Sequence, residues 1–267
     1  MPGNATTDYD PNADHSFPDG RLDEILPEIL DDPEVRALLE AQNVNPTSRL
    51  GYNDHGGKHV EIVRNRALRL YELLKESNVP FNGAADHDAL TEADEPVIVA
   101  LAATLHDVGH IIHRDRHTEF SISIAADVLD RLLKPYYPVA ERVPMKGEIL
   151  HAILCHHSNE RPLTTEAGVI RIADALDMER GRSRIPYERG GRGINTISSQ
   201  AIDSVELLRG EDTPVLVEIT MRNAAGVYQI DGLLMEKLDG SGLEDAIRIV
   251  GINRSASDDQ LLERIEL

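Results

Sequence analysis

The apolar residues in the first two thirds of the chain recur at intervals of three and four, the period of an amphipathic helix. Residues 59–74 follow this pattern throughout, and residues 95–107 are apolar on nearly every side, as expected of a central buried helix. Asp32 followed by Pro33 is typical of a helix start. Further helices are predicted over residues 22–39 (one or two short helices), 118–133, 146–157 and 166–179.

The pattern changes beyond residue 200. Residues 215–221 and 227–234 are rich in β-branched residues and flank a turn at 223–226, which predicts a β-hairpin. Residues 247–252 predict a third strand, and 243–246 a short helix. The predicted fold class is therefore mainly α. It consists of a disordered acidic tail (1–20), a helical domain (21–200) and a small α+β C-terminal module (201–267).

The charge of the chain narrows the choice of partners. The net charge is −20, with only five lysines against 22 arginines. Such acidity argues against nucleic acid or an anionic membrane as the main partner. Abundant Asp and Glu with scarce Lys is typical of salt-loaded cytoplasms, as in halophilic archaea, where screening makes self-repulsion tolerable. A merely acidic protein of an ordinary cytoplasm is the alternative.

Cysteine content and hydropathy indicate a cytoplasmic protein. The single cysteine, Cys155, excludes an internal disulfide, and its apolar neighbours predict a buried, inert thiol. No stretch approaches the roughly 18 apolar residues of a membrane span. Residues 1–20 lack the basic and apolar regions of a signal peptide.

The candidate chemistry lies in histidines and two aspartates. Eight of the eleven histidines are gathered at three places, and Asp107 and Asp174 both occur in apolar runs. A buried, unpaired carboxylate costs several kcal/mol, so each requires a cation or a partner. A bound divalent metal satisfies both needs, and a set of imidazoles and carboxylates suits Zn, Mn, Fe, Co or Ni better than calcium. The three groups of histidines are His55 and His59; His106, His110, His113 and His117; and His156 and His157.

The sequence LHDVGH at residues 105–110 resembles the signature of the HD superfamily of metal-dependent phosphohydrolases, in which the adjacent His and Asp bind metal. The dipeptide His106-Asp107 alone is a weak indication of this family, but an ordered set of further motifs accompanies it over roughly residues 50–180. These are KHVEIV at 58–63, RHTE at 116–119, CHHS at 155–158 and RIADA at 171–175. The resemblance implies a helical bundle of the HD type. The GYP motif of one branch is absent after His157, which counts against a cyclic-di-GMP phosphodiesterase of that branch.

The resemblance also implies a ligand set for two divalent ions, whether Mn, Fe, Ni, Co, Zn or Mg. The first ion would be held by His59, His106, Asp107 and Asp174. Asp107 would bridge to a second ion, completed by His117 and by His156, His157 or both. His55 would be an additional ligand or would only line the cleft, and His113 competes with His117.

The implied reaction is hydrolysis of a phosphoester, of a nucleotide or a related phosphomonoester or phosphodiester, by a hydroxide that bridges the ions with Asp107. His110, one helical turn after His106, is the candidate proton donor for the leaving group. Alternatively, His110 only donates a hydrogen bond to a carboxylate. A non-catalytic metal- or nucleotide-binding regulator and a di-iron oxygenase of the HD type are the alternative functions.

Phosphate recognition requires positive charge, which this acidic chain concentrates in residues 180–192. The alternative for this arginine-rich segment is a solvated loop that pairs with the acidic surface. The C-terminal module carries no catalytic motif and would cap the cleft or form a homodimer interface. The candidate substrate-binding residues are Lys58, Arg161, Arg180, Arg182 and Arg184.

Overall fold

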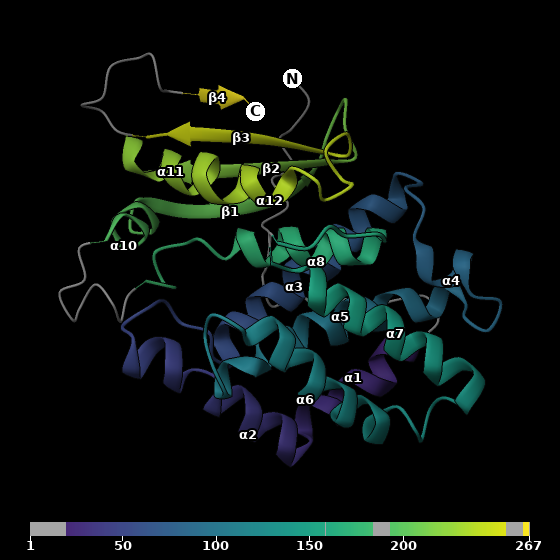
Figure 1. Cartoon of the computed structure of the whole chain (residues 1–267). Helices are drawn as coiled ribbons and strands as arrows, with labels where there is room; N and C mark the ends of the chain where they lie inside the picture. The colour runs from purple at the N-terminus through teal and green to yellow at the C-terminus, as the bar shows by residue number, and fades with distance from the viewer. Residues whose placement is uncertain (1–19, 158, 184–192, 255–263, 267) are drawn as a thin grey trace.

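The computed structural model describes residues 20–157, 159–183, 193–254 and 264–266. Helices occupy the chain up to Leu176, and a four-stranded sheet follows. The sheet lies at one end of the molecule, and most of the helices lie below it in the view of Figure 1. The fold is mainly α with a small C-terminal α+β module, as predicted. The helices of the first part are α1 (Arg21–Asp31), α2 (Pro33–Ala41), α3 (Gly57–Glu76), α4 (Asn82–Asp86), α5 (Glu95–Leu105), α6 (His117–Leu132), α7 (Val139–Cys155) and α8 (Thr165–Leu176). Short turns of helix are η1 (Val44–Arg49), η2 (Glu92–Asp94) and η3 (Val108–Ile111).

The predicted apolar segment 95–107 is the central helix α5, in which every residue is buried. It contacts α3, α7 and α8, so the bundle is assembled around it. The Asp32 side chain accepts hydrogen bonds from the backbone N–H groups of Glu34 and Val35, which confirms the predicted helix start. Helix α7 begins seven residues before the predicted start at 146, and α8 ends three residues before the predicted end at 179.

The predicted hairpin of 215–221 with 227–234 is wrong. Strand β2 (Val215–Met221) pairs instead with β1 (Ile202–Arg209), which the sequence reading missed. The segment after β2 is helical, in η4 (Ala224–Gly226), α11 (Val227–Gln229), η5 (Ile230–Leu234) and α12 (Met235–Leu238). Its buried residues Ile230, Leu234 and Leu238 are four apart, which is the period of a helix. The β-branched composition was therefore a weaker guide than the spacing.

The helical segment is the crossover that joins two parallel strands. Strand β3 (Ile247–Asn253), predicted over 247–252, pairs in parallel with β2, and β4 (Arg264–Glu266) pairs antiparallel with β3. Parallel neighbours require such a crossover. The predicted helix at 243–246 is wrong, because Glu244–Ala246 form a turn that leads into β3. Helices α11 and α12 run across one face of the sheet (Figure 1), and α12 contacts α8.

Among the described residues no helix is both long and apolar enough to cross a membrane. Helix α10 (Ile194–Ser199) connects the helical part to β1.

Candidate metal centre

Several helix ends of the bundle meet at one place and bring the predicted residues together. His59 lies in the first turn of α3 and His117 is the first residue of α6. His106 and Asp107 follow the last residue of α5, and His156 follows that of α7. Asp174 lies near the end of α8. Segments that are distant in sequence thus deliver side chains to one cluster.

Asp107 stands at the centre of this cluster, and its two carboxylate oxygens face different histidines. Oδ2 lies 2.7 Å from His55 Nδ1, 3.4 Å from His59 Nε2 and 3.5 Å from His106 Nε2. Oδ1 lies 3.4 Å from His110 Nε2, 3.5 Å from His117 Nε2 and 3.8 Å from His156 Nε2. A carboxylate placed between two sets of nitrogens is the arrangement required of a bridging ligand.

Asp174 also lies close to two histidines that face Asp107 Oδ2. Its Oδ1 lies 3.3 Å from His59 Nε2 and 3.8 Å from His106 Nε2. Among the described residues, three groups have ligand atoms within 4.8 Å of one another. They are His55, His59 and Asp107; His59, His106 and Asp174; and Asp107, His117 and His156.

Hydrogen bonds to Nδ1 orient most of the imidazoles. The Nδ1–H groups of His106, His117 and His156 donate to the backbone carbonyls of Ala103, Arg114 and Ile153 at 2.7–2.8 Å. His59 Nδ1 donates to Asp177 Oδ2 at 2.6 Å. Such partners fix the tautomer and turn Nε2 toward a metal.

The Nε2 atoms of these rings lack partners that would satisfy their lone pairs, and a bound cation would supply one. The Nε2 atoms of His59 and His106 are buried and have no hydrogen-bond partner. The Nε2 atoms of His117 and His156 lie 3.1 Å apart. With Nδ1 protonated on both rings, both nitrogens are acceptors, and neither satisfies the other. The residues present therefore fit a bound divalent metal.

The electrostatics favour the ligand forms of most of these groups. Burial lowers the pKa of His117 to about 4 and also lowers the pKa values of His106 and His156, so these rings are neutral at pH 7. Burial raises the pKa of the Asp107 carboxyl, but the neighbouring His106 and His110 outweigh it and hold the pKa well below its ordinary value.

His59 differs from the other rings. Burial lowers its pKa, but the carboxylates of Asp107, Asp174 and Asp177 outweigh this and raise the pKa to about 10. Positive charge is thus required between these carboxylates, and without an ion a protonated His59 supplies it. A metal bound here would displace this proton.

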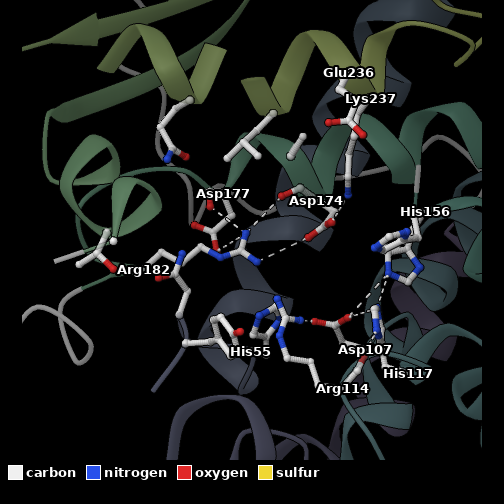
Figure 2. Close-up of a pocket in the computed structure, with 18 of the residues that line it drawn as sticks. His55, Asp107, Arg114, His117, His156, Asp174, Asp177, Arg182, Glu236 and Lys237 are labelled. Atoms are coloured by element: carbon white, nitrogen blue, oxygen red, sulfur yellow. Dashed lines mark hydrogen bonds and ion pairs between the residues drawn. The ribbon is translucent and has the colours of Figure 1, made fainter. Parts of the chain in front are cut away.

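A cavity of about 580 Å³ opens over the cluster. Figure 2 shows the guanidinium of Arg182 beside Asp174 and Asp177, with which it forms ion pairs at 3.9 and 3.7 Å. Arg182 donates to the carbonyl oxygens of Asp174 and Asp177 at 3.3 and 2.8 Å. The other lining residues include Tyr52, His55, Arg114, His117, His157, Ile194, Gln229, Leu233, Glu236 and Lys237.

Three of the remaining predicted site residues lie outside the cavity. Lys58, Arg161 and Arg180 are exposed and do not line the cavity, and Lys58 forms an ion pair with Glu61. Arg184 lies outside the described residues. His157 is exposed but lines the cavity, next to the buried His156.

Two further histidines had competing assignments, and the structure places both. His110 is buried behind Asp107, does not line the cavity, and stacks on His117 with ring centroids 4.1 Å apart. His113 is exposed and lies outside the metal-competent groups of the described residues.

The cavity residues that the sequence analysis did not predict include Arg114, Asp177 and Lys237. Asp177 follows Asp174 by one helical turn, so its spacing was an available signal. Arg114 lies between His113 and His117, in a segment whose pattern indicates metal ligands and gives no separate signal for an arginine. Lys237 is about 60 residues from the nearest ligand and has no local signal at all.

Comparison with known proteins bears on this cluster. The HD domain family matches residues 54–179 of the chain. An uncharacterized protein of Methanocaldococcus jannaschii is 37% identical over 225 residues, which cover 84% of this chain and 86% of the relative. No solved structure matches. The matched family range contains the whole cluster and ends before the C-terminal sheet.

Proposed function

Because the chain belongs to the HD-domain family, we propose that it is a metal-dependent phosphohydrolase that cleaves the phosphoester of a small molecule, with nucleotides as the favoured substrate class. The observation that carries this proposal is the position of the histidine–aspartate cluster at the wall of a cavity that cations also line. Metal ligands next to anion-binding groups suit a phosphoester and its developing negative charge.

The proposed ligands form two sets that share Asp107. His59, His106 and Asp174 complete the first set, and His117 and His156 the second. When bound, divalent ions would lower the pKa of a water to supply the nucleophile and would neutralise charge on the phosphoryl oxygens. His157 is a further candidate for the second set, since its ring centroid lies 5.8 Å from that of His117.

The protein side chains divide the remaining work. Asp177 holds the His59 ring in position through its hydrogen bond to Nδ1. Arg182 holds the end of α8, and with it Asp174, through the two carbonyls that it binds. Arg114 lies over the Tyr52 ring at 4.3 Å and lines the cavity. Its charge is therefore available to a phosphate in the cavity.

The cavity also suits the rest of a nucleotide. Its volume of about 580 Å³ is within the usual range for small-molecule sites. Tyr52, Ile194 and Leu233 give part of its wall apolar and aromatic character that a base would contact.

His110 has a supporting role in this proposal. Its ring is buried and separated from the cavity by Asp107, from whose Oδ1 its Nε2 lies 3.4 Å. This position suits a hydrogen bond that orients Asp107 better than direct protonation of a leaving group.

The proposal is tested with p-nitrophenyl phosphate, bis(p-nitrophenyl) phosphate and a nucleotide panel, each with Mn²⁺, Ni²⁺, Co²⁺ or Mg²⁺. Assays at low and high KCl are both required, because the net charge of −20 repels anions until salt screens it. Release of p-nitrophenol or phosphate with at least one metal is the expected result. A protein that binds its ions and yet turns over none of these substrates would refute the proposal. Iron-dependent oxygen uptake would instead favour an oxygenase.

The central ligand is tested by Asp107→Ala, which should abolish metal binding and activity together. Asp127→Ala is the matched control, because Asp127 is an exposed residue of α6 outside the cluster. Metal content measured by plasma emission spectroscopy should fall in the first variant only. Full metal content in Asp107→Ala would show that Asp107 does not bridge the ions.

A further inference from the structure

The C-terminal module extends a lysine into the metal centre. Lys237, in α12, forms an ion pair with Asp174 Oδ2 and lines the cavity (Figure 2). The other oxygen of the same carboxylate faces the unpaired Nε2 atoms of His59 and His106 at 3.3 and 3.8 Å. The ammonium therefore contacts one proposed metal ligand, Asp174, and only the width of that carboxylate separates it from His59 and His106.

The position of Lys237 is fixed by a buried arginine. Arg171 lies one helical turn before Asp174 in α8 and is only 4% exposed. Its guanidinium donates to the carbonyl oxygen of Lys237 at 2.8 Å, of Asp239 at 3.2 Å and of Glu236 at 3.4 Å. These carbonyls are at the C-terminal end of α12, where no intrahelical donor is available to them. Helix α8 thus holds both Asp174 and the end of the helix that carries Lys237.

A close backbone contact docks the two helices further. A Cβ atom at Gly168 of α8 would lie 2.6 Å from the carbonyl oxygen of Ser241, in the turn after α12. Only glycine permits this approach. Because α12 is packed directly on α8, Lys237 is a built part of the cavity wall.

Lys237 has hydrogen-bonding capacity beyond its ion pair. An ammonium has three donors, of which Asp174 accepts one. Its side chain is 17% exposed, and the exposed part borders the cavity. A cation with free donors beside a metal centre suits an anionic oxygen that the ions also contact.

We propose that Lys237 binds a phosphate oxygen of the substrate, so that the C-terminal module forms part of the substrate site. This inference rests on the proposed function, in that the ligand is a phosphoester. It assigns a binding role to a part of the chain outside the range that the HD domain family matches.

The test is calorimetric titration of the Mn²⁺-loaded full chain with inorganic phosphate, with metal content measured on the same samples. Lys237→Met should weaken phosphate binding by about tenfold or more, the loss typical of a charge-assisted hydrogen bond, with unchanged metal content. Lys237→Gln, which keeps a donor to Asp174 without the charge, should show the same loss, and Lys237→Arg should retain most of the affinity. Lys146→Met is the matched control, because Lys146 pairs with Asp130 away from the cavity.

Two results would overturn the inference. Phosphate affinity of Lys237→Met or Lys237→Gln within about twofold of the unmutated protein would show that the ammonium does not bind phosphate. Loss of metal from both variants would show that Lys237 only supports Asp174. The titration requires no turnover, so its result can be distinguished from that of the activity assay. If the unmutated protein hydrolyses phosphoesters while the variants bind phosphate normally, only this inference fails.

Discussion

Gly109, between Asp107 and His110, is expected to be essential for the second half of the metal centre. A Cβ atom at this position would lie 1.9 Å from the carbonyl oxygen of His117 and 2.4 Å from the backbone nitrogen of Ser121. Both obstacles are backbone atoms at the start of α6, so no side chain can rotate away. Gly109→Ala therefore requires η3 and α6 to separate.

The size of the required movement follows from these distances. Real Cβ contacts are essentially never shorter than 3.0 Å, so the His117 oxygen must move by about 1.1 Å. A ligand distance tolerates only about 0.2 Å. The hydrogen bond from Gly109 N–H to Ser121 Oγ, 2.8 Å long, would be strained as well. Overpacking of this kind costs roughly 1–3 kcal/mol, and a clash with backbone falls at or above the upper end.

The variant is compared with Gly147→Ala. Gly147 is an exposed glycine inside α7, and a Cβ atom there meets nothing within 4 Å. That substitution should stabilise the fold by about 0.5–1 kcal/mol, because alanine favours a helix. The chain has no tryptophan, so urea unfolding is followed by circular dichroism, with metal content measured in parallel.

Gly109→Ala should lower both the free energy of unfolding and the metal content, with loss of the ion that His117 would hold. If its stability and metal content both equal those of Gly147→Ala, the close packing of η3 on α6 is wrong.

Two further predictions concern residues outside the metal centre. Burial raises the pKa of the Cys155 thiol to about 11. Iodoacetamide at about pH 8 should therefore leave the native protein unmodified and should label Cys155 only after unfolding in urea. Rapid labelling of the native protein would contradict the burial of this thiol. Arg131 and the α2 backbone lower the pKa of Asp32 to about 2. The stability from this carboxylate is thus present above its ordinary pKa of 3.8 and lost as the pH falls toward 2. Asp32→Ala should lower the free energy of unfolding by about 1–2 kcal/mol at neutral pH, whereas Asp32→Asn, which keeps the cap, should cost less.

The sequence predicted those parts of the fold in which spacing and composition agree. Residues 59–74 have both helical spacing and helix-forming residues, and they form a helix in the structure. Residues 95–107 are apolar on nearly every side, and the length of this run predicts the buried helix that the structure has there. In residues 227–234 the two signals conflict, because Val227, Tyr228 and Ile230 favour strands while Ile230 and Leu234 have helical spacing. Packing against the sheet settles this conflict in favour of the helix, and local propensity contains no information about that contact.

The site shows the same division between local and distant information. Asp107 could be found from the sequence, because a carboxylate at the end of an apolar helix demands a cation wherever the helix lies in the fold. The negative charge of Asp174 is balanced in part by Lys237. Lys237 reaches Asp174 only because β2 and β3 pair in parallel, the crossover between them is helical, and α12 contacts α8. None of these steps has a signature near residue 237. Lys237, which comes from the C-terminal module, is therefore recognisable as a site residue only in the folded structure. Its role follows from its ion pair with the Asp174 carboxylate.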